Sequence, residues 1–148
     1  MHHLQVEAIA NGTVIDHIPA GKGLKIIHRL QLKHKDIRLT IGLNLPSNAM
    51  QHKDLIKIND LQLTPEKAAE FALFAPDATI NVISHYRVTQ KYRMQKPEQL
   101  RGLFQCPNTN CITRFEPIAS WFAVKQADNQ LKLRCQYCER SFSEDLFQ

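Results

Sequence analysis

The sequence predicts an α+β protein in two parts: a ferredoxin-like βαββαβ domain with an antiparallel sheet, then a small all-β, zinc-ribbon-like domain. Two observations support this division. Strand and helix patterns alternate along the first two-thirds of the chain, whereas all four cysteines lie beyond residue 105. Between these regions, residues 95–99 form a polar stretch with one proline, which is typical of a linker. We therefore expect domains at residues 1–97 and 98–148.

The first domain is expected to begin with two strands and a helix. Residues 4–9 and 13–18 are β-prone runs, and Asn11-Gly12 between them is a turn signal. Pro19 suits the first position of a helix, although the glycines at 21 and 23 weaken its first turn. The expected apolar stripe of this helix has residues three apart: Leu24, Ile27 and Leu30.

Two further strands are expected in the middle of the first domain. Residues 38–45 alternate between polar and apolar side chains with period two, and residues 46–48 should end that strand. Residues 54–58 form another β-prone run, and a long β-rich run at 79–92 closes the domain.

A second helix is expected before that last run. Thr64 provides an N-cap, Pro65 suits the first helical position, and Pro76 should end the helix. Its apolar residues follow helical spacing: Ala68, Phe71, Ala72 and Ala75. The order from residue 13 onward is then βαββαβ, and the strand at 4–9 could join an edge of the sheet.

Composition and charge limit the function. With 43% hydrophobic and 22% charged residues, the chain is globular. It contains no 18-residue apolar run and no signal peptide, so we expect a cytoplasmic protein with reduced thiols. Residues 1–97 carry 13 Lys and Arg against 8 Asp and Glu, whereas residues 98–148 carry 6 of each. An anionic partner should bind the first domain, unless its surface is merely basic.

The cysteine spacing predicts a zinc site. Cys106 and Cys111 are separated by four residues, and Cys135 and Cys138 by two, so each pair can present two thiolates from one turn. The four-residue first turn departs from the usual ribbon. Two disulfides or four buried free thiols are the alternatives, and a reducing compartment disfavours the first. Four thiolates leave no open coordination position, so one Zn²⁺ would be structural. Residues 119–124 and 131–134 read as paired strands between the cysteine pairs.

Both halves resemble the regulatory chain of aspartate carbamoyltransferase. The similarity covers essentially the whole chain and includes the spacing of the cysteines. The segments that carry it are Leu4–Ile9, Gly12–Ala20, Thr40–Ser47, Lys53–Ile58, Ala75-Pro76, Ala78–Asn81, Cys106–Ile112, Phe122–Val124 and Cys135–Glu139.

This resemblance implies an allosteric subunit without catalytic activity. In the family, CTP inhibits, often with UTP, and ATP activates. Regulatory chains form homodimers, and the zinc domain docks on the catalytic chain. Three regulatory dimers and two catalytic trimers make the holoenzyme of the first committed step of pyrimidine synthesis. By family position Asn108, Asn110 and Glu139 would face the catalytic chain, although asparagines also suit tight turns on their own account.

The resemblance also implies a phosphate-binding set. Lys91 and His17 should meet the triphosphate, with Asn81 and the backbone of Val88 nearby. Lysine supplies a point charge on a long stem, which suits a polyanion. Without the family match, Lys91 would read as a solvated strand lysine.

The nucleoside would be held by other residues. The resemblance places Asp16 and Lys57 at the ribose hydroxyls and the base, and the backbone near Ile9 and Tyr86 at the exocyclic amino group that cytosine and adenine share. Asp16 and His17 are sequence neighbours, and neighbouring strand residues point to opposite faces. Their site must therefore wrap around the strand or depend on local twist.

One departure concerns the second ligand, UTP with a divalent cation. The family has a longer N-terminal tail with a lysine before Leu-Gln-Val-Glu, where this chain has His3. Lys53 is another residue that could contribute to that second site, as a weaker candidate than the lysine of the family.

Two other classes of function compete with this interpretation. A nucleic-acid-binding zinc ribbon would suit the sequence pI of about 9.1, but residues 98–148 are charge-neutral. For the same reason Trp121 is interpreted as a core residue. A zinc enzyme is disfavoured by ligation through cysteine alone. We therefore expect neither nucleic acid nor a membrane as partner.

Overall fold

The computed structural model describes residues 8–30, 36–127 and 130–147. The chain divides into two compact units, residues 1–95 and 96–148. Among the described residues, no helix is long and apolar enough to span a membrane.

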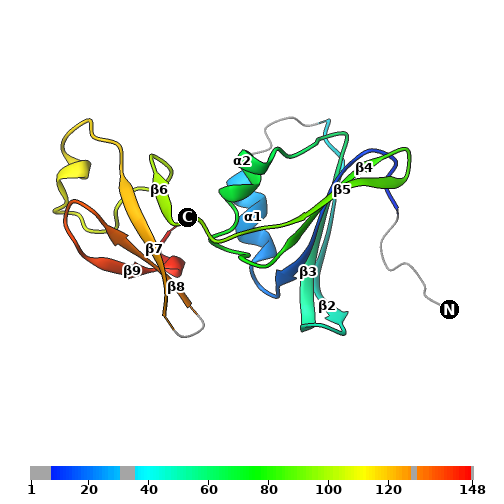
Figure 1. Cartoon of the computed structure of the whole chain (residues 1–148), viewed down its shortest axis with the longest axis horizontal. Helices are drawn as coiled ribbons and strands as arrows, with labels where there is room; N and C mark the ends of the chain where they lie inside the picture. Colours follow the sequence, from blue (N-terminus) through cyan, green and yellow to red (C-terminus); the bar gives the residue numbers. More distant parts are fainter. Residues whose placement is uncertain (1–7, 31–35, 128–129, 148) are drawn as a thin grey trace. The chain divides into compact units, whose positions relative to one another are not determined.

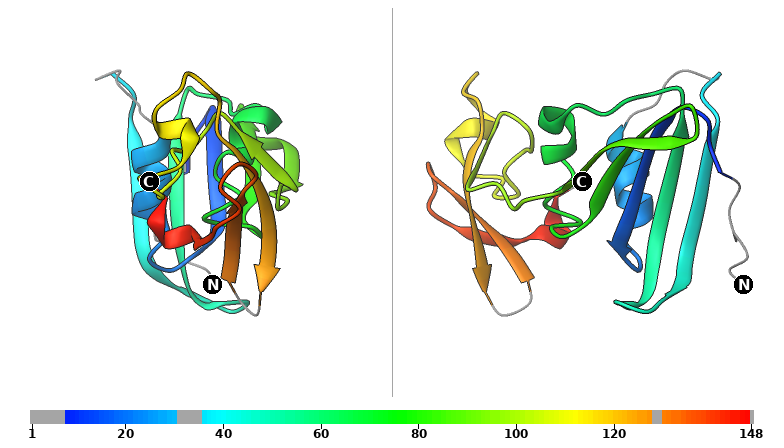
Figure 2. Two further views of the ribbon diagram at one scale, coloured as in Figure 1. Left: turned by 90° about the vertical axis from the view of Figure 1, so that its left-hand side faces the viewer. Right: turned by 45° about the vertical axis from the view of Figure 1, so that its right-hand side comes forward.

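The first unit is a five-stranded antiparallel sheet with the strand order β2-β3-β1-β4-β5. Two short helices lie on one face of this sheet (Figure 1; Figure 2), and no described helix covers the other, which we call the open face. The elements in chain order are β1 Gly12–Pro19, α1 Gly23–Leu30, β2 Leu39–Ser47, β3 Gln51–Asn59, α2 Pro65–Ala69, β4 Thr79–Ser84 and β5 Arg87–Arg93.

Strand alternation sorts side chains between the helical face and the open face. On β3, Ile56 and Ile58 are fully buried in the core, and Lys57 between them points to the open face. Strand pairing aligns residues that point to the same face. Ile56 pairs with Ile15, and Lys57 pairs with Val14. Along these strands, the side chains that alternate with the core residues therefore point to the open face.

A β-bulge interrupts the alternation on β1. Ile15 pairs with Ile56 and Ile18 pairs with Asp54, so β1 has one more residue than β3 over this stretch. Both isoleucines are fully buried, although the two residues between them would put them on opposite faces of a regular strand. His17 takes the left-handed conformation, with φ of 57°. The bulge places Asp16 and His17 together, away from the core, so the site does not need to wrap around the strand.

Helix α1 begins later than predicted, and a different set of its side chains is buried. It begins at Gly23 rather than at Pro19, and Leu24 is 60% exposed. The cause is the buried carboxylate of Asp54, which accepts hydrogen bonds from the backbone N–H groups of Gly21 (3.0 Å) and Gly23 (2.8 Å). These bonds hold the preceding turn out of the helix and rotate its buried face to Gly23, Ile26 and Leu30.

Helix α2 is shorter than predicted. Thr64 caps it as expected, accepting a hydrogen bond from the Lys67 N–H at 3.2 Å, but the helix ends at Ala69 instead of reaching Ala75. Residues 71–75 continue as tight turns, and all five are at most 2% exposed. A regular amphipathic helix would leave one face in water, so surrounding packing overrides the helical pattern here. The predicted apolar residues are nevertheless all buried.

The strands predicted at 13–18, 38–45 and 54–58 are confirmed with adjusted bounds, whereas the run at 79–92, counted as one strand of the βαββαβ order, is two strands joined at His85 and Tyr86. These two strands are the β4–β5 hairpin, and β2 continues through Pro46 to Ser47. Proline is tolerated because β2 is an edge strand. Most of the strand predicted at 4–9 lies outside the described residues, and Ala8 and Ile9 belong to no strand.

The second unit is a four-stranded antiparallel sheet with the order β6-β7-β8-β9. The predicted pair of strands is confirmed as β7 and β8. The core of this unit contains an aromatic cluster, in which the ring of Phe147 packs edge-on against Phe122 at 5.2 Å and Phe104 at 5.6 Å between centroids. The elements are β6 Gln99–Arg101, η1 Ile112–Arg114, β7 Trp121–Ala127, β8 Gln130–Cys135, β9 Ser141–Ser143 and η2 Glu144–Leu146.

Candidate functional site

The four cysteines of the second unit converge as the spacing predicts. Their Sγ atoms all lie within 4.8 Å of one another. The Sγ atoms of Cys106 and Cys138 are 3.8 Å apart, and those of Cys111 and Cys135 are 3.7 Å apart. Four sulfur atoms at about 2.3 Å from one zinc ion form a tetrahedron with edges of about 3.8 Å. Two of the six Sγ–Sγ distances in the cluster match this edge and none exceeds 4.8 Å, which is consistent with a four-thiolate zinc site.

Two of the four thiols must lose a proton before they can bind a metal ion. Burial raises the pKa of Cys106 and of Cys135, so these two thiols keep their protons at neutral pH in the absence of a metal. Thiolates, not thiols, ligate metals, so a bound cation must displace those protons.

The other two thiols are already inclined to ionise. Burial acts to raise the pKa of Cys111, but hydrogen bonds from the side chain and backbone of Thr113 outweigh it and lower the value to about 7. Burial also opposes ionisation of Cys138, and hydrogen bonds from the Arg140 backbone and the Asn108 side chain overcome it and lower its pKa. These donors form the outer shell that orients metal ligands.

The residues predicted to face a partner surround this cluster. Asn108 is occupied within its own turn, where its Oδ1 accepts a hydrogen bond from the Asn110 N–H at 3.0 Å. Asn110 is exposed. Glu139 is also exposed, in the left-handed conformation after the second cysteine pair, 3.8 Å from the guanidinium of Arg134. Asn108 thus has the turn role that its residue type suggested, and its role in an interface stays a prediction.

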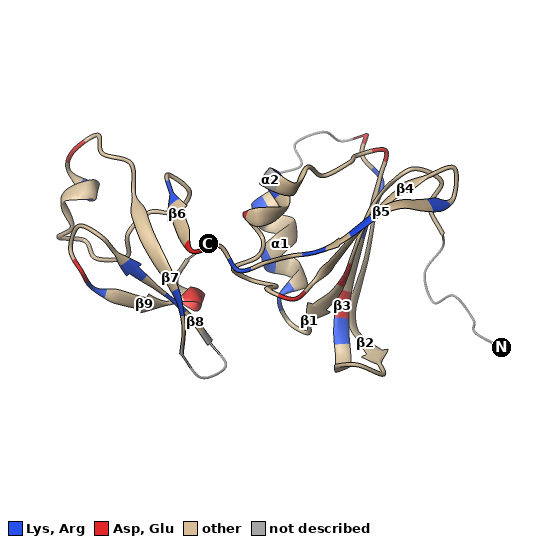
Figure 3. Ribbon diagram, in the orientation of Figure 1, with Lys and Arg blue, Asp and Glu red and all other residues tan. Residues whose placement is uncertain are grey.

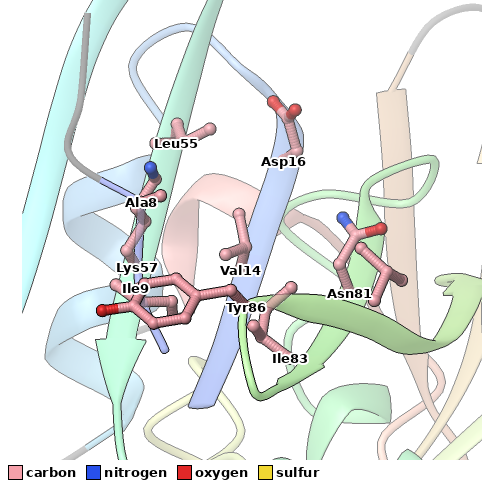
Figure 4. A pocket seen from close by; sticks show the side chains of 10 residues that line it. Ala8, Ile9, Val14, Asp16, Leu55, Lys57, Asn81, Ile83 and Tyr86 are labelled. Carbon is pink, nitrogen blue, oxygen red and sulfur yellow. The ribbon is translucent and has the colours of Figure 1, made fainter. Parts of the chain in front are cut away.

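In the first unit, a hollow of about 300 Å³ occupies the open face (Figure 4). Strands β1, β3, β4 and β5, the segment before β1 and the β4–β5 turn contribute to it. Six of the eight residues predicted to bind a nucleotide line it: Ile9, Asp16, Lys57, Asn81, Tyr86 and Val88. The remaining lining residues are apolar: Ala8, Val14, Leu55 and Ile83.

Polar groups at this hollow come from its side walls. Lys57 is only 8% exposed, with its stem packed on the open face of β3. The Asp16 carboxylate forms an ion pair with Lys53 at 2.8 Å and accepts a hydrogen bond from the His17 N–H at 2.7 Å. An oriented carboxylate and a buried lysine beside an apolar floor suit a ring-shaped ligand with hydroxyl groups.

The two remaining predicted residues, His17 and Lys91, line a second hollow of about 580 Å³. The His17 Nδ1 and Thr79 Oγ1 atoms are 3.1 Å apart, which fixes the imidazole on the open face. Lys91 pairs in register with Asn81 of the first hollow, so the two hollows adjoin along β4 and β5. Basic residues lie along β5 and on part of β3 (Figure 3).

One positively charged side chain at the second hollow, that of Arg93, was not predicted from the sequence. Arg93 lines it beside Lys91, two residues further along β5, and pairs in register with Thr79. The period-two spacing of Lys91 and Arg93 was the available signal, since residues two apart on a strand share a face. One acidic residue, Asp77, also lines this hollow. His3, which stands where the family has a lysine, lies outside the described residues.

The two units together define a class of protein. An open sheet face with adjoining apolar and basic hollows suits an anionic small molecule. The four-thiolate cluster has no free position for a substrate. This combination is that of a ligand-binding regulatory protein.

Comparison with known proteins identifies the family. The allosteric domain of the aspartate carbamoyltransferase regulatory chain matches residues 4–95, and the metal binding domain of the same chain matches residues 98–148. The regulatory chain of Tolumonas auensis is 49% identical over 143 residues, 97% of this chain and 93% of that protein. The one from Aeromonas salmonicida is 48% identical over 145 residues, 98% and 94% of the two chains. The one from Chromobacterium violaceum is 50% identical over 141 residues, 95% and 93%.

The chain therefore belongs to the family of aspartate carbamoyltransferase regulatory chains. It is an allosteric, non-catalytic chain with a metal-binding domain, and it associates with catalytic chains.

Proposed function

We propose that the open face of the first unit binds one nucleoside triphosphate, CTP as inhibitor or ATP as activator. The observation that carries this proposal is the division of the predicted residues between two adjoining hollows. The 300 Å³ hollow has an apolar floor with Asp16 and Lys57 at its walls, and the 580 Å³ hollow holds His17, Lys91 and Arg93. A nucleoside triphosphate needs both environments side by side, the first for its nucleoside and the second for its phosphates.

The nucleoside occupies the first hollow. Asp16 accepts hydrogen bonds from the ribose hydroxyls, and Lys57 donates to an oxygen of the ribose or the base. The backbone N–H of Tyr86 already donates to the Ala10 carbonyl at 2.9 Å. The exocyclic amino group is therefore read by carbonyl oxygens, those of Ile9 and Tyr86, which accept from cytosine and from adenine alike.

The triphosphate occupies the second hollow. Lys91 and Arg93 supply fixed positive charges, and His17 adds a hydrogen-bond donor on the side of the β1 bulge. Asn81 and the Val88 backbone lie at the junction with the nucleoside. Lys53 is engaged with Asp16, so its part in a second site for UTP and a divalent cation would compete with that ion pair.

The metal of the second unit is one structural zinc ion held by Cys106, Cys111, Cys135 and Cys138. The sulfur distances and the reducing cytoplasm expected for this family support zinc over disulfides. With zinc, this unit is a zinc-ribbon-like module. The first unit is ferredoxin-like, because its first four strands have the order β2-β3-β1-β4 with every pairing antiparallel.

The second unit docks on the catalytic chain. Beside the first cysteine pair, the segment 112–118 exposes three large apolar side chains, and Phe115 is 71% exposed. Exposed apolar groups beside the metal are held in place by the cluster, as an interface requires. Asn110 and Glu139 contribute the polar rim. The three apolar residues are Ile112, Phe115 and Ile118.

Homodimerisation uses the β2 edge of the first sheet. Ile41 and Leu43 on this edge strand and Leu24 at the start of α1 are exposed apolar residues, whereas β5 at the other edge is largely polar. Three such dimers then link two catalytic trimers in the cytoplasm, with residues 1–97 sensing nucleotides and residues 98–148 docking.

The proposal is tested by titrating the zinc-loaded chain with CTP and then with ATP by calorimetry. We expect saturable binding of each nucleotide, and the presence of one should weaken the apparent affinity of the other as simple competition requires. Independent binding of both nucleotides would contradict a shared site, and no binding of either would contradict the sensor itself.

A further inference from the structure

We propose that the aromatic ring of Tyr86 stacks on the base of the bound nucleotide and sets the relative affinity for purine and pyrimidine ligands. This inference rests on the proposed function, which assigns Tyr86 a role through its backbone alone.

The first observation is the position of the ring. Tyr86 is 71% exposed, yet it lines the nucleoside hollow. In Figure 4 its side chain reaches from the β4–β5 turn toward the side of the hollow formed by Ile9 and Lys57. Among the described residues that line this hollow, Tyr86 is the only aromatic one. A ring left in water beside an apolar floor can cover a flat ligand that enters between them.

The second observation is that the backbone beneath this ring is fixed. His85 and Tyr86 form the two-residue turn of the hairpin, with φ of 52° and 64°. The Tyr86 N–H donates to the Ala10 carbonyl at 2.9 Å, and the His85 N–H donates to the Asn11 Oδ1 at 3.2 Å. These bonds tie the turn to the segment that carries Ile9. The ring therefore projects from a defined point, and stacking costs little ordering of the backbone.

The third observation is the apolar floor of the hollow. Val14, Leu55 and Ile83 form an aliphatic surface on the open face of the sheet. A base lying on this surface has one face covered and one face toward the turn. Aromatic stacking on that second face is tolerant of sequence, because every base has a π surface.

Stacking discriminates where the carbonyl oxygens do not. Cytosine and adenine both present an exocyclic amino group, so the backbone reads them alike. The bicyclic purine offers a larger π surface, so the Tyr86 ring should favour ATP over CTP. Since the two ligands act in opposite directions in the proposed function, this ring sets the nucleotide ratio at which the response changes sign.

The test compares three substitutions in the whole zinc-loaded chain by calorimetric titration with ATP and with CTP. Tyr86→Phe keeps the ring, Tyr86→Leu keeps apolar bulk without a π surface, and Tyr86→Asn removes both while tolerating a positive φ. We expect Tyr86→Phe to bind within about twofold of the unsubstituted chain. Tyr86→Leu and Tyr86→Asn should bind ATP about 5- to 30-fold more weakly and CTP by a smaller factor.

A second readout separates stacking from a structural role. On saturation with ATP, the ring protons of Tyr86 should shift upfield in the NMR spectrum, and Tyr86→Phe should show the same shift. Equal affinities of Tyr86→Leu and the unsubstituted chain for both nucleotides, or no upfield shift, would overturn the inference and leave the proposed site standing. Absence of binding by the unsubstituted chain would instead remove the proposed function, and this inference with it.

Discussion

Replacement of Cys135 by serine is expected to abolish zinc binding and unfold residues 96–148, while residues 1–95 stay folded. Cys135 is fully buried, and its Sγ lies 3.7 Å from that of Cys111. A unit of this size has a hydrophobic core worth only about 3–5 kcal/mol, whereas a structural zinc ion contributes about 10–16 kcal/mol. Loss of one ligand therefore removes most of the free energy that holds this unit together.

The single tryptophan of the chain reports on this change. Trp121 lies on β7, with the Arg101 guanidinium 4.2 Å from its ring and its Nε1–H donating to Gln99 at 3.0 Å. Its emission should move to that of a solvated indole in Cys135→Ser, with zinc content falling from one per chain to none. Thr109→Ala is the matched control, because Thr109 is an exposed residue of the first cysteine turn. A folded, zinc-free Cys135→Ser chain with unchanged Trp121 emission would refute a structural role for the metal.

The second large effect is expected for Lys91→Ala, which should weaken the binding of CTP and of ATP by a similar factor of about 10- to 150-fold. A hydrogen bond to a charged group contributes about 1.5–3 kcal/mol, and the phosphates are common to both nucleotides. Lys91 is exposed on the open face beside His17 and Arg93, so its removal leaves the fold intact. Calorimetric titration of the folded variant measures the change.

Lys67→Ala provides the matched control for charge. Lys67 lies on α2, which packs on the opposite face of the sheet, and its ammonium pairs with Glu70 at 3.0 Å. The control removes the same charge and should leave both affinities within about twofold, because Lys67 lines neither hollow. Equal losses in both variants would indicate a general effect of net charge. Unchanged binding by Lys91→Ala would remove Lys91 from the phosphate site.

The metal site was predictable from the sequence because its information is local. Each pair of cysteines lies within one turn, so spacing alone brings two thiolates together. The donors that tune them were not predictable, because Thr113 and the Arg140 backbone act through the geometry of folded turns.

The fold was predictable where the spacing of apolar residues matches their burial. It was not predictable where tertiary contacts determine the ends of a helix. The strands follow period-two runs, but the start of α1 depends on Asp54, which is 31 residues away from Gly23 in the sequence. The end of α2 depends on burial of residues 71–75 on all sides. Neither effect leaves a periodic signal along the chain.

The residues proposed to bind the nucleotide were predicted from the family resemblance, and single-residue patterns would not have indicated them. Asp16 and His17 share the open face only because of the β1 bulge, which is visible in the pairing of Ile18 with Asp54 and not in the alternation of residues. Arg93 could have been found, since it repeats the spacing of Lys91 along the same strand.

The most direct test of the account is activity in the assembled complex. The zinc-loaded chain would be combined with the catalytic trimers of a close relative, and carbamoyl transfer measured at subsaturating aspartate with CTP or ATP added. We expect CTP to lower the rate and ATP to raise it, and we expect Lys91→Ala complexes of the same size to lose both responses. Complexes that assemble but respond to neither nucleotide would contradict the claim that the open face of this chain is the regulatory site.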